Sequence, residues 1–306
     1  MFELSDITID KKNYINQFLK RRNSKNSEFS FTNLFIWRKS YDIKYTVIDD
    51  MLCIFLKHDN GPISATFPIG FVNPDGSEKD VTAAINFILD WFNSQKYEPM
   101  ICLYGDKAEK KLITTFPNKF IFTEDRNNFD YVYKIEDLIN LAGKKYHSKR
   151  NHINKFIAKY PNFEYCKITP EDSQECINLF DTWQQSKNNG SSAGVAEERE
   201  AIIELLNNWE ALGVTGCCIK INGKMVAFSF GEALSDDTVV IHFEHADTSY
   251  EGIYSVINQK FLENEWHSYK FVNREEDMGI AGMRKAKQSY HPILMLEKHI
   301  ATLISK

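Results

Sequence analysis

A short pattern near the start of the chain recurs about half-way along it. Each copy has the signals of a short strand, a helix-starting Thr and an amphipathic helix. Three pairs of matching residues lie 161 to 162 positions apart: Phe2-Glu3 and Phe163-Glu164, Ile7-Thr8 and Ile168-Thr169, and Ile15-Asn16 and Ile177-Asn178. A repeat of this period in a chain of 306 residues predicts two domains that share one fold.

The order of expected elements repeats as well. The first half is expected to hold helix 11–21, strands 45–48, 51–56 and 66–69, helix 80–92, strand 99–104, helix 108–116, and strands 120–123 and 131–134. The second half is expected to hold strand 163–168, helix 170–185, a loop at 186–195, helix 197–212, strands 215–221, 224–230 and 239–246, helix 253–266, a strand from Phe271, helix 282–289 and strand 293–296. Asn222-Gly223 is a strong hairpin signal. We predict an α/β (α+β) fold with domains at 1–137 and 161–306, joined by a helix at 138–160.

Composition excludes several classes of protein. The formal net charge is −5, so no global basic surface for nucleic acid or anionic membrane is expected. The six cysteines form no CxxC pair, which predicts reduced, buried thiols and no metal site. The N-terminus has no apolar signal core, and no apolar window is long enough to span a bilayer. A cytoplasmic protein without a transmembrane segment is expected.

The helix expected between the two domains is strongly basic. From Leu138 to Phe163 the chain has six Lys or Arg and no Asp or Glu. Helical spacing gathers its apolar residues on one side and leaves residues such as Lys149 and Arg150 on the rest. The segment 144–159 is either a linker helix with solvated charges or an anion-binding edge that contacts tRNA.

A second polar stretch, Phe271 to Pro292, follows the strand expected at Phe271. It runs through Asn273, Glu275 and Asp277, then two glycines, and ends in a basic helix with Arg284 and Lys287. Ligands gather beyond the carboxyl ends of strands in α/β folds. Arg284 and Lys287 share a helical face and could clamp a phosphate, with Lys149 and Arg150 as partners. The stretch is either such a site or a solvated turn with surface ion pairs.

These segments carry a resemblance to a known family. The runs GKKYHSKRNHINKF (143–156), GKMVAFSFGE (223–232) and VNREEDMGIAGMRKAKQSYHP (272–292) resemble uncharacterised bacterial proteins grouped with the C-terminal domain of phosphatidylglycerol lysyltransferase. That resemblance implies two tandem GNAT domains (acyl-CoA N-acyltransferase-like), each with a mixed, mostly antiparallel sheet flanked by helices, and a distant relation to Fem-type aminoacyltransferases. It implies transfer of an aminoacyl group, with aminoacyl-tRNA as the donor. It does not firmly imply any cofactor.

The loop before helix 253–266 bears on the donor. In GNAT enzymes that use acetyl-CoA, this loop binds the pyrophosphate through backbone N–H groups and small residues. Here only Gly252 fits that pattern, because Tyr254 replaces the second small residue and Glu251 adds a negative charge. Acetyl-CoA or another acyl-CoA is therefore the alternative donor. Tyr250 either stacks on an adenine or packs in the core.

Strand 239–246 supplies the catalytic candidates. Strict alternation would put His242 and Glu244 on one face. Acyl transfer needs a base for the attacking amine or hydroxyl and donors for the oxyanion. We expect Glu244 as the base, with Glu275 or Asp277 binding a cationic amine. The alternative is that Glu244 and His242 only satisfy one another or a neighbouring Lys.

Three functional hypotheses remain at this point. The first is an aminoacyltransferase that passes an aminoacyl group from aminoacyl-tRNA to a small-molecule or peptide amine or hydroxyl by direct attack. The second is an acyl-CoA-dependent N-acyltransferase with a degenerate pyrophosphate loop. The third is a catalytically silent module that binds tRNA or a nucleotide through the basic helix.

Overall fold

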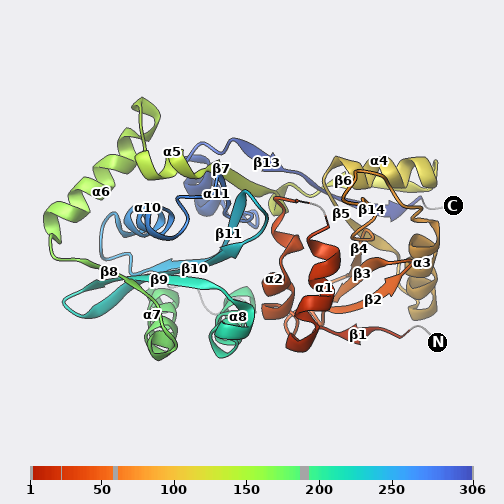
Figure 1. Cartoon of the computed structure of the whole chain (residues 1–306), viewed down its shortest axis with the longest axis horizontal. Helices are drawn as coiled ribbons and strands as arrows, with labels where there is room; N and C mark the ends of the chain where they lie inside the picture. The colour runs from red at the N-terminus through yellow and green to blue at the C-terminus, as the bar shows by residue number, and fades with distance from the viewer. Residues whose placement is uncertain (1–2, 22, 58–60, 187–192, 305–306) are drawn as a thin grey trace. The chain divides into compact units, whose positions relative to one another are not determined.

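The computed structural model describes residues 3–21, 23–57, 61–186 and 193–304. Most of the loop expected at 186–195 lies outside these residues. Packing divides the chain into two compact units (Figure 1). The N-terminal unit holds Met1–Asp130, Glu276–Gly279 and Met295–Lys306, and the C-terminal unit holds Tyr131–Glu275 and Ile280–Leu294.

The N-terminal unit is built on a seven-stranded sheet in the order β1-β2-β3-β4-β5-β14-β6. Its strands are β1 (Ser5–Asp6), β2 (Lys44–Ile48), β3 (Met51–Lys57), β4 (Ile63–Thr66), β5 (Met100–Tyr104), β6 (Phe120–Glu124) and β14 (Lys298–Leu303). Its helices are α1 (Lys12–Leu19), α2 (Phe31–Ile36), α3 (Thr82–Gln95) and α4 (Asp106–Thr115), with short 3-10 turns at Ile9–Lys11, Ser27–Phe29 and Arg126–Asn128. Ile85, Ile88 and Phe92 of α3 are fully buried, because this helical stripe packs into the sheet core.

The C-terminal unit repeats the design with the sheet order β13-β7-β12-β11-β10-β9-β8. Its strands are β7 (Asp130–Lys134), β8 (Glu164–Lys167), β9 (Thr215–Ile221), β10 (Lys224–Ala233), β11 (Thr238–Ala246), β12 (Phe271–Asn273) and β13 (Leu294–Leu296). Its helices are α5 (Ile135–Asn140), α6 (His147–Lys159), α7 (Ser173–Ser186), α8 (Ala193–Asn207), α9 (Trp209–Leu212), α10 (Ile253–Glu265) and α11 (Ala281–Gln288), with 3-10 turns at Lys144–Tyr146 and Pro170–Asp172. Helix α10 covers one face of the sheet, and α7 and α8 lie against the other (Figure 1).

The two halves of the chain exchange one strand each. β14, from the end of the chain, lies between β5 and β6 of the N-terminal sheet, and β7 lies between β12 and β13 of the C-terminal sheet. The division therefore differs from the domains expected at 1–137 and 161–306. A short strand can pair through its backbone N–H and C=O groups with strands of either sheet, so its position along the chain does not determine its sheet.

Buried charges fix the start of β14. Lys298, its first residue, is 4% exposed, and its ammonium lies 2.7 Å from Asp130 and also pairs with Glu28. Burial alone would lower the pKa of Lys298, but these two carboxylates raise it above the usual range. Ser27 donates to Asp130 from its backbone N–H and its hydroxyl, both at 2.9 Å. Because Asp130 is the first residue of β7, the starts of both exchanged strands meet at this network.

Smaller differences from the expected elements concern turns. The strand expected at 66–69 is β4 at Ile63–Thr66, and the chain then leaves the strand and returns to pair Ile69 with Leu52. The hairpin turn has φ +51 at Asn222 and +78 at Gly223, which is the geometry that an Asn-Gly pair favours. All six cysteines are free, and four of them are fully buried.

Candidate functional site

Two parallel strands diverge in the C-terminal unit. β11 and β12 pair in parallel from Thr238–Phe271 to Val240–Asn273, where the pairing ends although β11 continues to Ala246. Side chains on the unpaired part of β11 and just after β12 therefore line the space between the separating strands. The polar residues of the Phe271–Pro292 stretch begin at this point, as the rule for ligand sites in α/β sheets leads one to expect. We call this place the C-terminal strand fork.

A bulge at His242 separates the two catalytic candidates of β11. On β10, Ser229 pairs with Glu244 and Gly231 pairs with Ile241, so β11 contains one extra residue between them. Strict alternation from His242 to Glu244 is therefore interrupted. The two side chains belong to different hydrogen-bond networks, described in turn below.

The first network joins Glu244 to Arg274. Arg274 Nη2 donates to Glu244 Oε1 at 2.8 Å, and Asn258 of α10 donates to Oε2 at 3.3 Å. The side chain of Arg274 is only 13% exposed, and that of Glu244 only 11%. Burial opposes the charge on Arg274, but Glu244 outweighs it and raises the pKa of the guanidinium. The other terminal nitrogen, Nη1, is buried and has no hydrogen-bond partner among the described residues. A buried donor without a partner costs free energy, which makes it a candidate ligand contact.

Tyr290 forms an aromatic platform for two cations in this network. Lys149 Nζ lies 3.7 Å from the centroid of the Tyr290 ring, and the Arg274 guanidinium carbon lies 5.0 Å from it. Burial, and then the positive charge of Arg274, lower the pKa of Lys149 to about 8, against a smaller opposing effect of Glu244. The Tyr290 hydroxyl donates to Ser255 at 3.3 Å, and burial raises its pKa. Lys149, Arg274 and Glu244 thus form one cluster with an excess of positive charge.

The backbone around Arg274 is held from two sides. Its N–H donates to the Tyr131 carbonyl at 2.9 Å, and its carbonyl accepts from Lys287 Nζ. The hydroxyl of Tyr133 in turn donates to the Lys287 carbonyl at 2.8 Å. Lys287 therefore stabilises the position of Arg274. Arg284 lies on the same helix and is partly buried.

The second network centres on His242, whose side chain is 1% exposed. Its Nδ1 lies 3.0 Å from Glu275 and its Nε2 lies 3.2 Å from Glu232. Burial alone would lower the pKa of His242, but these hydrogen bonds and charges outweigh burial and raise it to about 9. Glu275 has a φ of +55, and its N–H donates to the Asn273 side chain at 2.7 Å. A charged His242 therefore fixes a strained residue directly after Arg274.

Asp277, a catalytic candidate, belongs to the N-terminal unit. Its side chain is fully buried there, 3.3 Å from Arg126 Nη1, and accepts from the Gly279 N–H at 2.9 Å. The chain turns sharply between Glu275 and Asp277, with Glu275 and Met278 both at positive φ. The stretch from Asn273 to Asp277 therefore does not continue as a regular strand, and Asp277 does not join Glu275.

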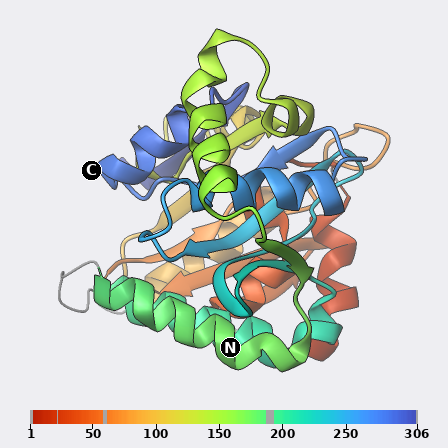
Figure 2. The same cartoon turned by 90° about the vertical axis from the view of Figure 1, so that its left-hand side faces the viewer.

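Three further candidates have local structural partners. Arg150 donates to the Leu141 carbonyl and, at 2.7 Å, to the Gly143 carbonyl, so it closes the turn before α6 and does not join Lys149. The Tyr250 ring packs on Tyr160 with a centroid distance of 5.2 Å. Gly252 has a φ of +91, and a Cβ there would lie 2.4 Å from the His152 carbonyl oxygen. Helix α6 lies across the start of α10, as Figure 2 also shows.

The sequence reasoning missed several members of the cluster. Arg274, Asn258, Ser255 and Tyr290 were not singled out, although Arg274 is the first residue after β12. Its position between Asn273 and Glu275 was the only available signal. Asn258 and Ser255 lie on α10, where their polar side chains face Glu244 and Tyr290 from an otherwise apolar helix.

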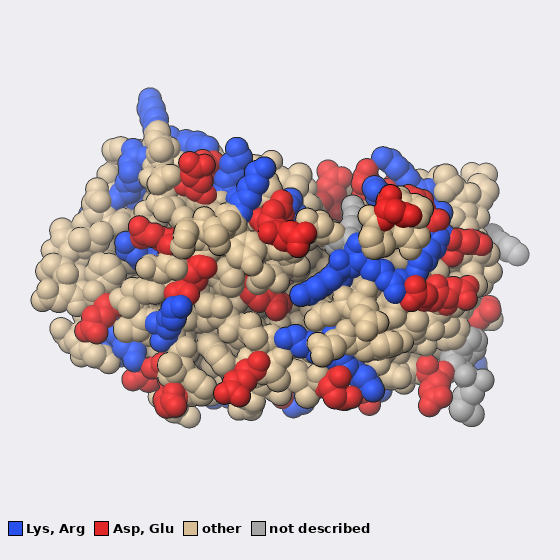
Figure 3. Space-filling model, in the orientation of Figure 1, with Lys and Arg blue, Asp and Glu red and all other residues tan. Residues whose placement is uncertain are grey.

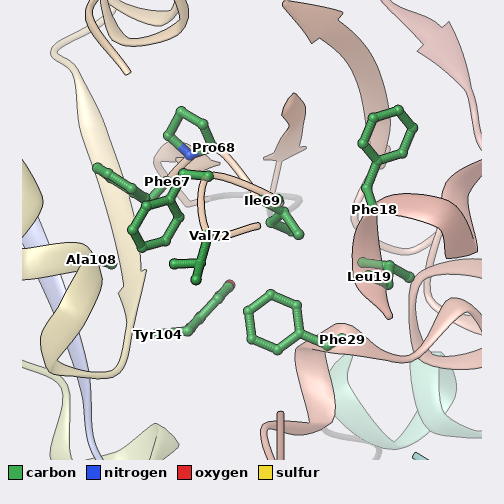
Figure 4. Close-up of a pocket in the computed structure, with 11 residues that line it drawn as sticks. Phe18, Leu19, Phe29, Phe67, Pro68, Ile69, Val72, Tyr104 and Ala108 are labelled. Carbon is green, nitrogen blue, oxygen red and sulfur yellow. The ribbon is translucent and has the colours of Figure 1, made fainter. Parts of the chain in front are cut away.

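The equivalent fork in the N-terminal unit has a different filling. β4 and β5 also pair in parallel, at Ala65–Ile101 and Thr66–Cys102. The chain after β4, from Phe67 to Val72, packs beside β5 and leaves a cavity of about 30 Å³, room for about two water molecules. Phe29 and Tyr104 face Val72 across this cavity (Figure 4). The side chains that line it are apolar apart from the Tyr104 hydroxyl. Burial raises the pKa of Tyr104 well above its usual range.

The described residues hold neither a metal-binding cluster nor a membrane-spanning helix. Within this part of the chain, no three His, Cys, Asp or Glu side chains are grouped so as to hold a metal ion. None of its helices combines the length and the apolar run that crossing a bilayer requires.

With this geometry in place, comparison with known families is decisive. Residues 19–302 match the model of the family described as "Phosphatidylglycerol lysyltransferase, C-terminal". The chain belongs to this family. The expected resemblance is confirmed, and it covers both units. The basic segment expected as one helix at 138–160 between the domains is instead the end of α5, a turn and α6, all within the C-terminal unit.

Individual relatives agree with this assignment. A conserved protein of unknown function from Bacteroides thetaiotaomicron is 38% identical, with a TM-score of 0.91 over 99% of this chain and 100% of that one. A curated relative, the uncharacterized protein MYCGA3080 of Mycoplasmoides gallisepticum, is 26% identical over 60% of this chain, and the match spans only 58% of its length.

More distant solved structures share the fold alone. L-PGS from Bacillus licheniformis has a TM-score of 0.67 at 12% identity, over 99% of this chain and 94% of that one. A tandem GNAT protein from the clavulanic acid biosynthesis pathway has a TM-score of 0.52 at 6% identity. That match covers 100% of this chain and 99% of the other. The tandem GNAT fold with two mostly antiparallel sheets is confirmed. The family is one of acyl-group transferases, and its name supports aminoacyl transfer in general terms.

Proposed function

We propose that this chain transfers an aminoacyl group from an aminoacyl-tRNA-type ester to an amine or hydroxyl acceptor by direct attack. The observation that carries the proposal is Arg274 Nη1 at the C-terminal strand fork, which has no hydrogen-bond partner in the described part of the chain. Its guanidinium is held by Glu244 and lies close to Lys149. Membership of a family named for a lysyltransferase supports the aminoacyl group over other acyl groups. The donor and acceptor are the parts that the experiments below test.

The chemistry assigns a role to each member of the cluster. Attack on an ester carbonyl develops negative charge on its oxygen, and Arg274 Nη1 is a preformed donor for that charge. Glu244 was expected to be the base, but its two oxygens already accept from Arg274 and Asn258. We therefore propose that Glu244 is a positioning residue that orients the guanidinium. Glu275 is engaged with His242 and supports the adjacent backbone.

Recognition of tRNA is proposed for the basic segment 144–159. Lys144, Lys145 and Lys159 are exposed. Figure 3 shows basic side chains at the end of the C-terminal unit where α6 begins. Phosphate contacts of this type make binding steeply salt-dependent. Arg284 on α11 is a further candidate phosphate contact.

An acyl-CoA donor is the weaker alternative. The start of α10, where a GNAT pyrophosphate would be bound, approaches α6 closely at Gly252, and Glu251 pairs with Lys155 at 3.1 Å. Calorimetric titration with acetyl-CoA beside titration with charged tRNA separates the two donors. Saturable binding of acetyl-CoA without binding of charged tRNA would reverse our ranking.

The direct test is a transfer assay with total tRNA charged with labelled amino acids. Acceptors would include small amines, hydroxyl compounds and phosphatidylglycerol vesicles. We expect label to leave tRNA for one acceptor class faster than without protein. Arg274→Lys keeps a cation beside Glu244 but removes the second donor, so we expect it to lower kcat by about 100-fold. Lys107→Gln, at an exposed position in the N-terminal unit, is the matched control.

A negative result is equally informative. If charged tRNA binds but its label reaches no acceptor, the chain is a silent binding module and the transfer proposal is wrong. If Arg274→Lys transfers at the wild-type rate, the fork is not the site.

A further inference from the structure

Lys149 differs from the other charged members of the C-terminal strand fork. Glu244 and Arg274 pair with each other, and His242 pairs with two carboxylates. Lys149 Nζ instead lies on the Tyr290 ring, and no carboxylate is within ion-pair distance of it in the part of the chain that the structure describes. Its side chain is partly buried and emerges from α6, which packs on α10. The Lys149 amine is therefore held in place by an aromatic ring and not by an ion pair with a carboxylate.

We propose that Lys149 Nζ is the proton acceptor of the transfer reaction and afterwards returns the proton to the leaving oxygen. This inference rests on the proposed function. The acceptor nitrogen forms a bond with the ester carbonyl carbon, and its proton passes to neutral Lys149. When the C–O bond of the ester breaks, the leaving oxygen takes that proton from Lys149. Atoms and charges balance without a further reactant.

The surroundings of Lys149 suit this role. Burial and the charge of Arg274 favour the neutral amine, while Glu244 favours the cation, and Tyr290 lies directly beneath Nζ. The resulting pKa of about 8 lies near neutral pH and near that of an α-amino group, so proton transfer costs little in either direction. Once protonated, Lys149 adds a positive charge beside the oxyanion that Arg274 binds.

The other ionisable groups of the fork are less suited to accept a proton. Glu244 would have to release Arg274 or Asn258 to become protonated. His242 already carries its proton, since its pKa is about 9, and both ring nitrogens face carboxylates. Lys287 donates to the Arg274 carbonyl. Of these four described groups, Lys149 is the one that can gain and lose a proton without breaking a hydrogen bond of the cluster.

A labelling experiment tests the amine without requiring turnover. Trace acetic anhydride acetylates neutral lysines, and peptide mass spectrometry gives the labelled fraction of each lysine against pH. We expect half-maximal labelling of Lys149 near pH 8, below the usual value of about 10.4 for exposed lysines. Arg274→Gln removes a positive neighbour and should raise this midpoint, whereas Glu244→Gln should lower it. A Lys149 midpoint equal to that of the exposed lysines would overturn the proposal.

Kinetics of two variants then tests the role. Lys149→Arg keeps the charge but cannot act as a base, and Lys149→Met removes both. We expect either variant to lower kcat by about 100-fold with an amine acceptor and to change KM far less. Hydroxylamine also loses a proton as its nitrogen attacks the carbonyl, so we expect a loss of similar size with this acceptor. Wild-type kcat for Lys149→Arg would overturn the base role and leave the proposed transfer intact, whereas absence of transfer in the wild-type protein would overturn both.

Discussion

The two strand forks of this molecule have the same backbone plan and opposite fillings. In each unit a parallel pair separates, between β4 and β5 in one and between β11 and β12 in the other. The N-terminal fork is filled by Phe67, Phe71, Val72 and their neighbours, and only a small apolar cavity remains. The C-terminal fork carries Glu244, Arg274 and Lys149, with a buried donor that has no partner in the described chain.

This difference separates stability from function within one chain. A fork filled with apolar side chains gains free energy from burial and offers no group for acyl transfer. A fork lined with charged side chains is less stable, because burying the charges removes them from water. Such an arrangement is expected where the charges serve a function other than stability. We infer that the N-terminal unit is structural at this position and that chemistry belongs to the C-terminal unit.

The largest expected effect comes from making the C-terminal fork resemble the N-terminal one. Arg274→Met leaves Glu244 buried without its partner, so we expect a loss of about 3–5 kcal/mol in unfolding free energy together with loss of transfer. Adding Glu244→Leu removes the unpaired carboxylate and should restore most of the stability but none of the activity. Urea unfolding and the transfer assay measure the two effects. Transfer by the double variant would show that the charges are not catalytic.

The reverse experiment removes part of the apolar packing in the N-terminal fork. Phe67 is 4% exposed, and its ring packs edge-on against the Phe71 ring with 5.0 Å between the ring centroids. Phe67→Ala should lower the unfolding free energy by about 3 kcal/mol and leave kcat unchanged at temperatures where the protein is folded. Ile113→Ala, at a residue that is 45% exposed on α4, is the control and should change stability by less than about 0.5 kcal/mol. A specific fall in kcat for Phe67→Ala would assign the N-terminal fork a role in the reaction.

Much of this comparison could be predicted from the sequence, but its decisive details could not. The repeat and the periodic apolar stripes predicted two copies of one fold, because period and element order depend on local residues. The exchange of β7 and β14 could not be predicted, since a short strand can pair with strands of either sheet. The bulge at His242 interrupted the expected alternation along β11, because the pairing register is fixed by the partner strand. Arg274 was overlooked for a related reason: only the fold shows that it meets Glu244.

The pH dependence of stability sharpens the comparison, because a buried imidazole belongs to the C-terminal fork. The pKa of His242 is raised from 6.5 to about 9, so its contribution is complete below about pH 6.5 and is lost as pH rises through 9. The difference in unfolding free energy between wild type and His242→Gln should shrink by up to about 3 kcal/mol across that range. Lys149, with a lowered pKa, acts in the opposite direction and is common to both proteins, so the difference isolates His242. A pH-independent difference would mean that His242 is not charged in the folded protein.

The smallest effect concerns the loops that follow the meander in each unit. Gly252 and Gly76 occupy corresponding loops, before α10 and before α3, and both have positive φ, +91 and +86. A Cβ at Gly76 meets nothing within 4 Å, whereas one at Gly252 would lie 2.4 Å from the His152 carbonyl oxygen. Gly76→Ala should therefore cost about 1 kcal/mol from backbone strain alone. Gly252→Ala should cost about 1–2 kcal/mol more and should also lower kcat, because displacement of α6 moves Lys149 away from Tyr290. Equal costs and unchanged kcat for both variants would show that the contact between α6 and α10 does not position the fork.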